Sequence, residues 1–537
     1  MTCATRSFHL MRYSRLWCAL SLCLWFSTCV LAGEAFSQER WESHVRMLAS
    51  PALEGRALGS KGAAKAAAYV ESQFRDYGLA PVPHLGYREA FPVTLDVEVS
   101  DASEKNSLNI AGPGSFAPLT LYRDYQPLSF SANGRCESAA LVFAGYAISA
   151  PELDYDDFAG IDVRGKVVVA FRREPQEEQA DSRFQGLDFT SHASFAAKAH
   201  EVAKRGGLAL LIVNNRLPEE ENDDLPQFSP SSGPETVPIP VLLVRAPAIA
   251  PFFVEQGLDL TSLSRSIDKS GKPQSVLFRP GYRVSLRVSM RSRSAEGVNV
   301  LAWKPGSTNE YVIVGAHYDH IGYGKRFSMD PSDKGKIHPG ADDNASGVAA
   351  MLELARRVSH GGTLRRGVLF VAFAGEEHGL FGSTALLHSP PSSLGKLAGM
   401  INFDMVGRMR ENELFIAGLE SVPALGDTTA EAAEHAGLSL QRITDYPYNM
   451  SDHGTFLEAG VPAVLFFTGL HMEYHTSRDT ADRVSPEGAM KVLSVAYETL
   501  RTMADSELPL KYQPGKDPGY ERKLREIAAP PNPFNQE

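Results

Sequence analysis

The sequence has little cysteine, no excess of positive charge and no long apolar run after its first 32 residues. Only five of its 537 residues are Cys, and four of these lie within the first 29. Lys plus Arg number 53 against 64 Asp plus Glu, a net charge of −11, whereas a nucleic-acid-binding protein usually presents a basic surface. A membrane-spanning helix needs roughly 18 or more apolar residues in a row. We therefore expect no nucleic-acid partner and, after residue 32, no membrane span.

Residues 1–32 have the order of a secretory signal peptide. The first 15 residues carry three arginines and no acid, and an apolar run over 16–32 ends in small residues. Removal of this segment would leave Cys136 as the only thiol, so we expect a mature chain without an intrachain disulfide. We predict a secreted or periplasmic protein, and the sequence does not distinguish the two compartments.

The remaining residues divide into four regions by composition. Residues 36–110 begin with helical patterns and are interpreted as the amino-terminal part of the main domain, whereas 111–290 contain short β-branched runs with one clear helix, typical of a mostly β insert. Residues 291–510 alternate continuous apolar strands with helices, and 511–537 form a tail that we expect to be poorly ordered. The alternation predicts an α/β fold with a mainly parallel central sheet covered by helices.

Imidazole and carboxylate side chains follow the strands of the alternating region. In open α/β sheets, ligands bind beyond the carboxyl ends of the strands. Each of these residues alone has an ordinary explanation, such as a helix cap or a solvated loop, but together they define a nitrogen and oxygen site suited to zinc or a similar divalent ion. The residues are His317, Asp319, Asp342, Glu376, Glu377, Asp404 and His475.

Several motifs resemble those of the M28 family of co-catalytic zinc exopeptidases. The resemblance covers residues 310–485 through GAHYDHIG, PGADDNASG, AFAGEEHGLFGS, NFDMVGR and YHTSRDT, and the segment LEGRALGSKG resembles the family's amino-terminal region. The insert resembles a protease-associated (PA) domain through YDDFAGIDVRGKVVVAF and VPIPVLLV. The resemblance implies a zinc-exopeptidase fold interrupted by a PA domain.

The resemblance also implies two zinc ions per chain, although other divalent metals are possible. Asp342 would bridge the two ions. Glu377 and His475 would complete the site of one ion, and His317 and Asp404 would complete the other.

The remaining candidate residues have roles around these ions. Glu376 would act as general base and acid, and Asp319 would orient His317. Tyr448 and Arg408 are candidate substrate-binding residues. His320 lies within a metal-site motif but outside the family's ligand positions, and we interpret it, with His338 and His378, as a non-ligand.

These expectations combine into an exported metallopeptidase that hydrolyses peptide bonds at the ends of peptides, most simply as an aminopeptidase. Three alternatives stay open at this point. They are a carboxypeptidase of the same family, an acyltransferase resembling glutaminyl cyclases, and a non-catalytic PA-domain binding protein. The sequence does not indicate an oligomeric state.

Overall fold

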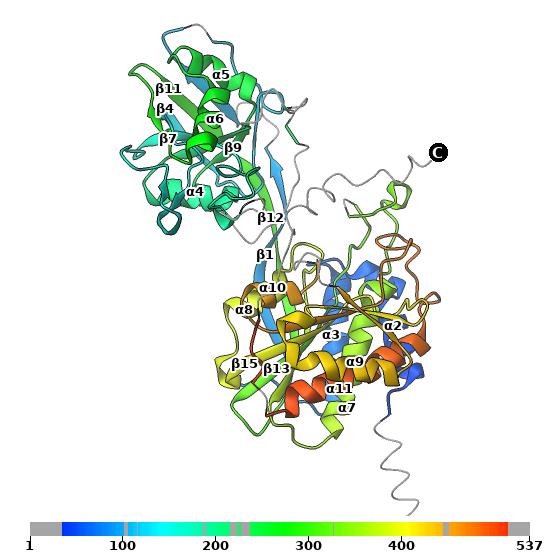
Figure 1. Ribbon diagram of the computed structural model, residues 1–537. Coiled ribbons are helices and arrows are strands. Elements are labelled where there is room, and N and C mark those ends of the chain that lie inside the picture. The colour runs from blue at the N-terminus through cyan, green and yellow to red at the C-terminus, as the bar shows by residue number, and fades with distance from the viewer. Residues whose placement is uncertain are drawn as a thin grey trace, which may run out of the picture. The chain divides into compact units, whose positions relative to one another are not determined.

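The chain is described by a computed structural model in which two units can be distinguished (Figure 1). The first consists of residues 35–91 and 297–513, and the second of residues 92–296. The segments 1–34 and 514–537, which include the expected signal peptide and most of the expected tail, lie outside the described residues, as do 101–105, 115, 185, 187–189, 215–222, 224, 227–236, 326, 444–449 and 508. None of the described helices has the length and apolar character needed to cross a membrane.

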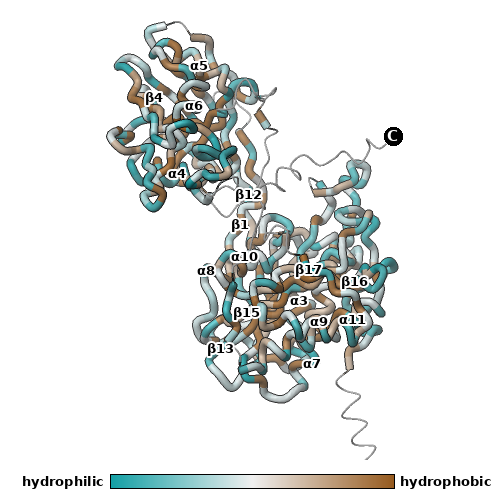
Figure 2. Tube along the Cα trace, in the orientation of Figure 1, coloured by the Kyte–Doolittle hydropathy of each residue, from teal (hydrophilic) through white to brown (hydrophobic). Residues whose placement is uncertain are grey.

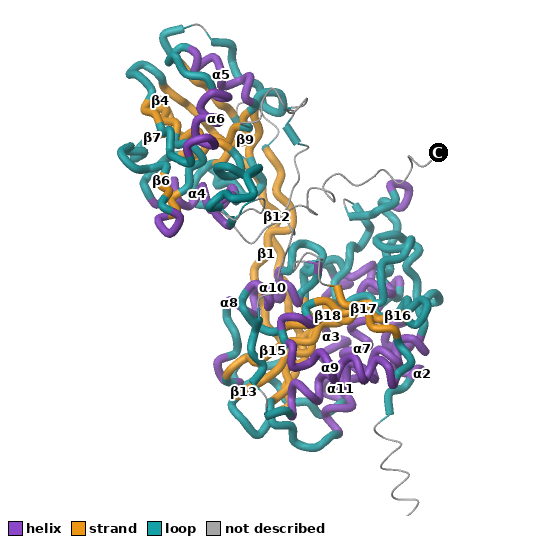
Figure 3. Tube along the Cα trace, viewed as in Figure 1, coloured by secondary structure: helices purple, strands orange, loops and turns teal. Residues whose placement is uncertain are grey.

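An eight-stranded sheet forms the centre of the first unit, in the order β1-β12-β14-β13-β15-β18-β16-β17 (Figure 3). The central strands β14, β13, β15 and β18 run parallel, β16 and β17 are parallel to each other, and β12 and β16 are antiparallel to their neighbours β14 and β18. The mainly parallel sheet expected from the sequence is thus confirmed. Two of the strands, β1 (Arg88–Val99) and β12 (Met290–Lys304), continue past the boundary into the residues of the second unit. The others are β13 (Glu310–His317), β14 (Gly367–Phe373), β15 (Lys396–Phe403), β16 (Glu413–Ala417), β17 (Ser439–Ile443) and β18 (Ala463–Phe467).

Helices cover both faces of this sheet because alternate strand residues point to opposite sides. On one side Phe370 of β14 packs on Phe74 of α3, with ring centroids 6.4 Å apart. Its neighbours Leu369 and Val371 join a different cluster with Leu386 of α8 and Phe456 of α10. Hydrophobic residues accordingly concentrate along the central strands (Figure 2). The helices are α2 (Gln38–Leu48), α3 (Lys61–Asp76), α7 (Gly347–His360), α8 (Phe381–His388), α9 (Gly426–His435), α10 (His453–Glu458) and α11 (Pro486–Asp505).

The second unit contains its own sheet, in the order β2-β11-β4-β7-β8-β9-β3 with β10 beside β4, and its own hydrophobic core. It begins before the expected boundary at residue 111, because Val97 and Leu108 belong to that core. The sequence pattern indicated one clear helix in this unit, whereas the structure describes three. Pro251 lies inside one of the additional helices and the other is rich in serine, so neither has a clear helical pattern in the sequence. The helices are α4 (Phe195–Lys204), α5 (Ala246–Val254) and α6 (Leu260–Ser270). The strands are β2 (Ser107–Ala111), β3 (Tyr125–Pro127), β4 (Gly134–Phe143), β7 (Lys166–Phe171), β8 (Ala209–Val213), β9 (Val241–Val244), β10 (Val276–Leu277) and β11 (Arg283–Val288), with the separate pair β5 (Ser149–Ala150) and β6 (Tyr155–Asp156).

Candidate metal centre

The candidate residues of the first unit meet at the carboxyl ends of its parallel strands. His317 is the last residue of β13, the pair Glu376–Glu377 follows β14, Asp404 follows β15 directly, and His475 lies in the loop after β18. All of these strands are buried. The sheet therefore brings residues that are up to 158 positions apart in the sequence to one edge.

Two groups of ligand-type atoms lie at this edge. In the first group, His317 Nε2 is 3.4 Å from Asp404 Oδ1, 3.4 Å from Asp343 Oδ1 and 3.9 Å from Glu376 Oε2. In the second group, His475 Nε2 is 3.1 Å from Asp343 Oδ2 and 3.0 Å from Glu377 Oε2. Asp343 thus contributes one carboxylate oxygen to each group.

The spacing of these atoms fits a zinc-type cation. Zinc binds nitrogen and oxygen ligands at about 2.0–2.1 Å, so two ligands of a tetrahedral ion lie about 3.3–3.4 Å apart. The contacts of His317 Nε2 with Asp404 and Asp343, and of His475 Nε2 with Asp343 and Glu377, are 3.0–3.4 Å long. Buried carboxylates so close together also require positive charge nearby. The donor set therefore fits divalent metal in both distance and charge.

The two imidazoles are oriented in the same way. His317 Nδ1 lies 3.2 Å from the Asp319 carbonyl oxygen and His475 Nδ1 lies 3.1 Å from the Phe327 carbonyl oxygen. A proton on each Nδ1 would donate to these carbonyls and leave Nε2 as the lone-pair donor. The ring of His475 also stacks on Tyr474, with centroids 3.9 Å apart. Both Nε2 atoms face the carboxylates, as metal binding requires.

The prediction that Asp342 bridges the two groups is wrong, because its side chain belongs to neither. Asp342 Oδ1 accepts a hydrogen bond from the Gly407 N–H at 2.6 Å, and Oδ2 lies 3.2 Å from His471 Nε2. The adjacent Asp343 occupies the bridging position instead. Two consecutive acids offer the same chemistry in a sequence, and only the path of the loop decides which of them faces the site.

Three further predicted assignments have different outcomes. His320, interpreted as a non-ligand, lies in the second group, with its Nδ1 2.6 Å from Glu377 Oε1. Arg408 does not line the pocket beside the metal centre, since its Nη2 donates to Glu473 Oε2 at 3.0 Å. Tyr448 lies outside the described residues.

Asp319 is buried behind the first group. Its Oδ1 accepts the backbone N–H of Glu376 at 3.2 Å and lies 3.9 Å from His317 Nδ1. Burial raises the pKa of Asp319 to about 7. Burial also raises the pKa of the Glu376 carboxyl well above its ordinary value, and the nearby carboxylates of Asp404 and Glu377 add to this effect. Burial lowers the pKa of His475, but the carboxylates of Glu377 and Asp343 outweigh burial and raise it to about 11.

Asp479 is a supporting residue that the sequence pattern did not single out. Its carboxylate accepts the backbone N–H groups of Asp342 and Asp343 at 3.0–3.1 Å and so holds the loop that carries the bridging carboxylate. The only signal in the sequence was its place in YHTSRDT, four residues after His475. A backbone-holding role leaves no spacing pattern, so the sequence alone could not reveal it.

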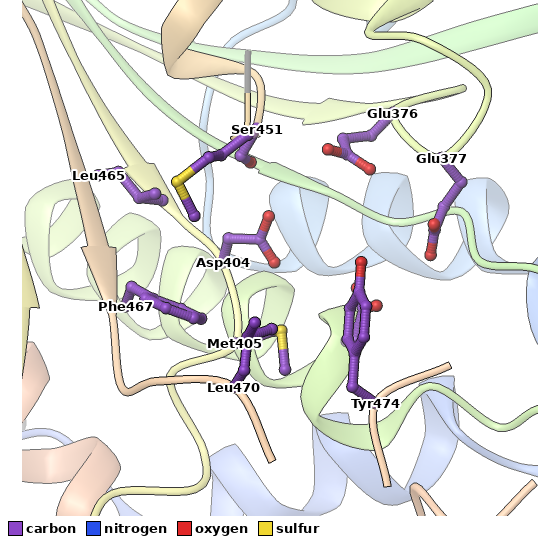
Figure 4. Close-up of a pocket in the computed structure, with 11 residues that line it drawn as sticks. Glu376, Glu377, Asp404, Met405, Ser451, Leu465, Phe467, Leu470 and Tyr474 are labelled. Carbon is purple, nitrogen blue, oxygen red and sulfur yellow. The ribbon is translucent and has the colours of Figure 1, made fainter. Parts of the chain in front are cut away.

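A pocket of about 210 Å³ opens beside the two groups (Figure 4). Glu376 and Glu377 lie on one side of Asp404 in this view, and Met405, Leu465, Phe467 and Leu470 lie on the other. The apolar wall can accept an apolar side chain while the carboxylates hold polar groups. The remaining lining residues are Asp343, Met450, Ser451 and Tyr474.

Comparison with known proteins identifies the family of this domain. The family model for peptidase family M28 matches residues 299–500, which include every candidate ligand. Residues 299–500 thus match peptidase family M28, and the resemblance found in the motifs is confirmed. The PA resemblance of the second unit stays a prediction.

The chain is similar in sequence to curated proteins and in fold to a solved structure. The chain is 26% identical to aminopeptidase YwaD of Bacillus subtilis over 322 residues (57% of this chain, 60% of that protein) and 40% identical to a probable zinc metalloprotease of Pyrenophora tritici-repentis over 192 residues (29% and 42%). The chain thus spans roughly half the length of these curated relatives. The fold is shared with an aminopeptidase from Aneurinibacillus sp. strain AM-1, at a TM-score of 0.50 and 23% identity, over 90% of this chain and 97% of that one.

Proposed function

We propose that the protein is an exported aminopeptidase that uses two zinc ions to remove residues from the amino end of peptides. The observation that carries this proposal is the position of Asp343, whose two oxygens each join a separate set of imidazole and carboxylate atoms at 3.1–3.4 Å. One ion would be held by His317, Asp404 and Asp343. The other would be held by Asp343, Glu377 and His475, with His320 beside Glu377. The family match and the names of the relatives support the same chemistry.

The residues around these ions have separate tasks. Zinc in such a site makes water more acidic and polarises the carbonyl group under attack. Glu376 lines the pocket, and its raised pKa suits a group that takes a proton from the attacking water and gives it to the leaving amine. Asp319 holds the Glu376 backbone N–H and lies beside His317, so it positions the base and one ligand together.

The charge of the pocket favours the amino end of a peptide over the carboxyl end. Asp343, Glu376, Glu377 and Asp404 line it, and none of its described lining residues is Arg or Lys. With both ions bound, Glu376 would be the one of these four carboxylates without a metal, and it could bind a substrate's amino group, whereas the lining offers no Arg or Lys to pair with a terminal carboxylate. Arg408, the candidate for that cation, is paired with Glu473 outside the pocket lining.

The first test compares free and blocked substrates. We expect the purified protein to hydrolyse leucyl-p-nitroanilide and leucyl peptides, and to lose this activity on dialysis against a zinc chelator and regain it with added zinc. Acetylation of the leucine amine should lower kcat/KM by at least about 100-fold, because it removes the free amino group that Glu376 would bind. Release of carboxyl-terminal residues from blocked peptides, or cyclisation of amino-terminal glutamine without hydrolysis, would contradict the proposal.

A second prediction concerns the side chain of the residue removed. The apolar wall formed by Met405, Leu465, Phe467 and Leu470 should favour Leu, Met or Phe at the amino terminus. Burial of each additional methylene stabilises the bound state by about 0.8 kcal/mol, so kcat/KM for a leucyl substrate should exceed that for an alanyl substrate by roughly 10–100-fold. Steady-state kinetics on a Gly, Ala, Leu, Phe and Glu series measure this, and a preference for Gly or Glu would exclude this pocket as the specificity site.

A further inference from the structure

Arg56 places a buried guanidinium group behind the metal centre. It ends the short helix η1 (Pro51–Arg56), within the segment LEGRALGSKG, and its side chain is 1% exposed. The described hydrogen bonds of this side chain all go to backbone carbonyl oxygens. Its Nε donates to Tyr318 O at 2.8 Å, its Nη1 to Pro339 O at 2.7 Å and Leu48 O at 2.5 Å, and its Nη2 to Gly340 O at 2.9 Å.

Two of the segments that Arg56 contacts carry the candidate ligands. Tyr318 stands between His317 and Asp319, and the segment 339–340 leads directly into the loop that carries Asp343. The backbone of η1 adds further contacts, since the Arg56 carbonyl accepts the His320 N–H at 3.3 Å. Two ligand loops are therefore involved, the loop of His317 and Asp319 and the loop of Asp343. The loop of Asp343 is held through its carbonyl groups by Arg56 and through its N–H groups by Asp479.

The charge of Arg56 matches this position. Burial lowers its pKa to about 10, and the carboxylates of Asp343, Asp479 and Asp319 act in the opposite direction. The guanidinium therefore stays protonated at neutral pH and offsets part of the repulsion among the buried carboxylates. A lysine would keep the charge but cannot donate to four separated carbonyl oxygens, because its single ammonium group lacks the planar fork of arginine.

We propose that Arg56 is a positioning residue of the metal centre: it fixes the loop of His317 and Asp319 against the loop of Asp343 at the separation that zinc binding needs. Arg56 touches neither group of ligand atoms, so it acts through the backbone that carries them. This inference rests on the proposed zinc-dependent function. It assigns to the amino-terminal segment, more than 200 residues before the strands of the site, a direct share in metal affinity.

Arg366 offers a matched control. It is also a buried arginine of the first unit, 3% exposed, and its Nη1 donates to the carbonyl oxygens of Met503 and Ser506 while its Nε pairs with Glu310. These contacts hold the end of α11 and do not include either ligand loop. Lysine substitutions at Arg56 and Arg366 therefore remove similar sets of hydrogen bonds from a similar environment, and only the first set supports the metal centre.

The test measures zinc affinity by competition with a chromophoric chelator in wild type, Arg56→Lys, Arg56→Met and Arg366→Lys. Loss of a residue that supports metal ligands typically lowers metal affinity about 10–100-fold, and we expect this loss in Arg56→Lys and a larger one in Arg56→Met. Arg366→Lys should stay within about twofold of wild type even if its melting temperature falls. Hydrogen exchange should quicken at 318–322 and 339–344 in the Arg56 variants and around 503–506 in the control.

The outcomes separate this inference from the proposed function. If Arg56→Lys binds zinc like wild type and its hydrogen exchange at 318–322 and 339–344 is unchanged, Arg56 has no positioning role. The proposed function would still stand. A wild-type protein that binds no zinc would overturn both. Arg56→Met removes the charge as well and is more prone to unfold, so if it is recovered unfolded, Arg56→Lys alone decides the question.

Discussion

Replacement of Glu376 by Gln is expected to lower kcat for leucyl substrates by about 10²–10⁴-fold, the usual contribution of a general acid–base group. Glutamine keeps the size of the side chain but cannot take a proton from water. The residues that would hold zinc are His317, Asp343, Glu377, Asp404 and His475. Glu376 Oε2 lies 3.9 Å from His317 Nε2, farther than the oxygens of Asp343 and Asp404, so Glu376 is not needed as a ligand. Metal analysis of the variant should therefore find as much zinc as in wild type.

The neighbouring residue Glu377 provides the control for this experiment. Glu377 Oε2 lies 3.0 Å from His475 Nε2, within the second group. The substitution Glu377→Gln should therefore lower zinc content and activity together, whereas Glu376→Gln separates them. Full activity in Glu376→Gln, or loss of zinc from it, would refute the role of Glu376 as the base.

Replacement of Asp343 by Asn should have the largest effect on metal binding. Asp343 is the only described residue that contributes an atom to each group, and an amide presents one neutral oxygen in place of two charged ones. Removal of a residue that only supports ligands costs about 10–100-fold in affinity, so loss of a shared ligand should cost more than 100-fold. Activity should become undetectable at zinc concentrations that saturate wild type.

Asp342→Asn is the matched experiment one position away. Asparagine can still accept the Gly407 N–H through its amide oxygen, and the side chain lies outside both groups. Zinc content should stay at the wild-type value, and kcat/KM should fall by less than about tenfold. The opposite pattern, with a severe effect at Asp342 and a mild one at Asp343, would restore Asp342 as the bridging residue.

The sequence was sufficient to predict the central sheet and most of the site. Apolar runs such as 310–317 are long enough and sufficiently β-branched to define strands, and parallel strands must end at a common edge. His317, Asp404 and His475 follow from that geometry, because each lies at or beyond a strand end.

Features that depend on the path of a loop could not be predicted in the same way. The choice between Asp342 and Asp343 depends on how one turn is held by Asp479, and no pattern in the sequence encodes that contact. Arg56 donates only to backbone carbonyls, which every residue type supplies, so its partners leave no signature. The short strand β17 lies at the edge of the sheet and lacks a continuous apolar run.

The division of the first unit into two chain segments has a consequence for protein engineering. A fragment limited to residues 299–500 would include the whole family match but would lack α2 and α3. The carboxylate of Glu353, fully buried in the intact protein, would lose its partner Arg40, and Phe370 would lose the ring of Phe74. Such a minimal fragment should therefore be insoluble, whereas joining residue 91 to residue 297 through a short linker should preserve these contacts.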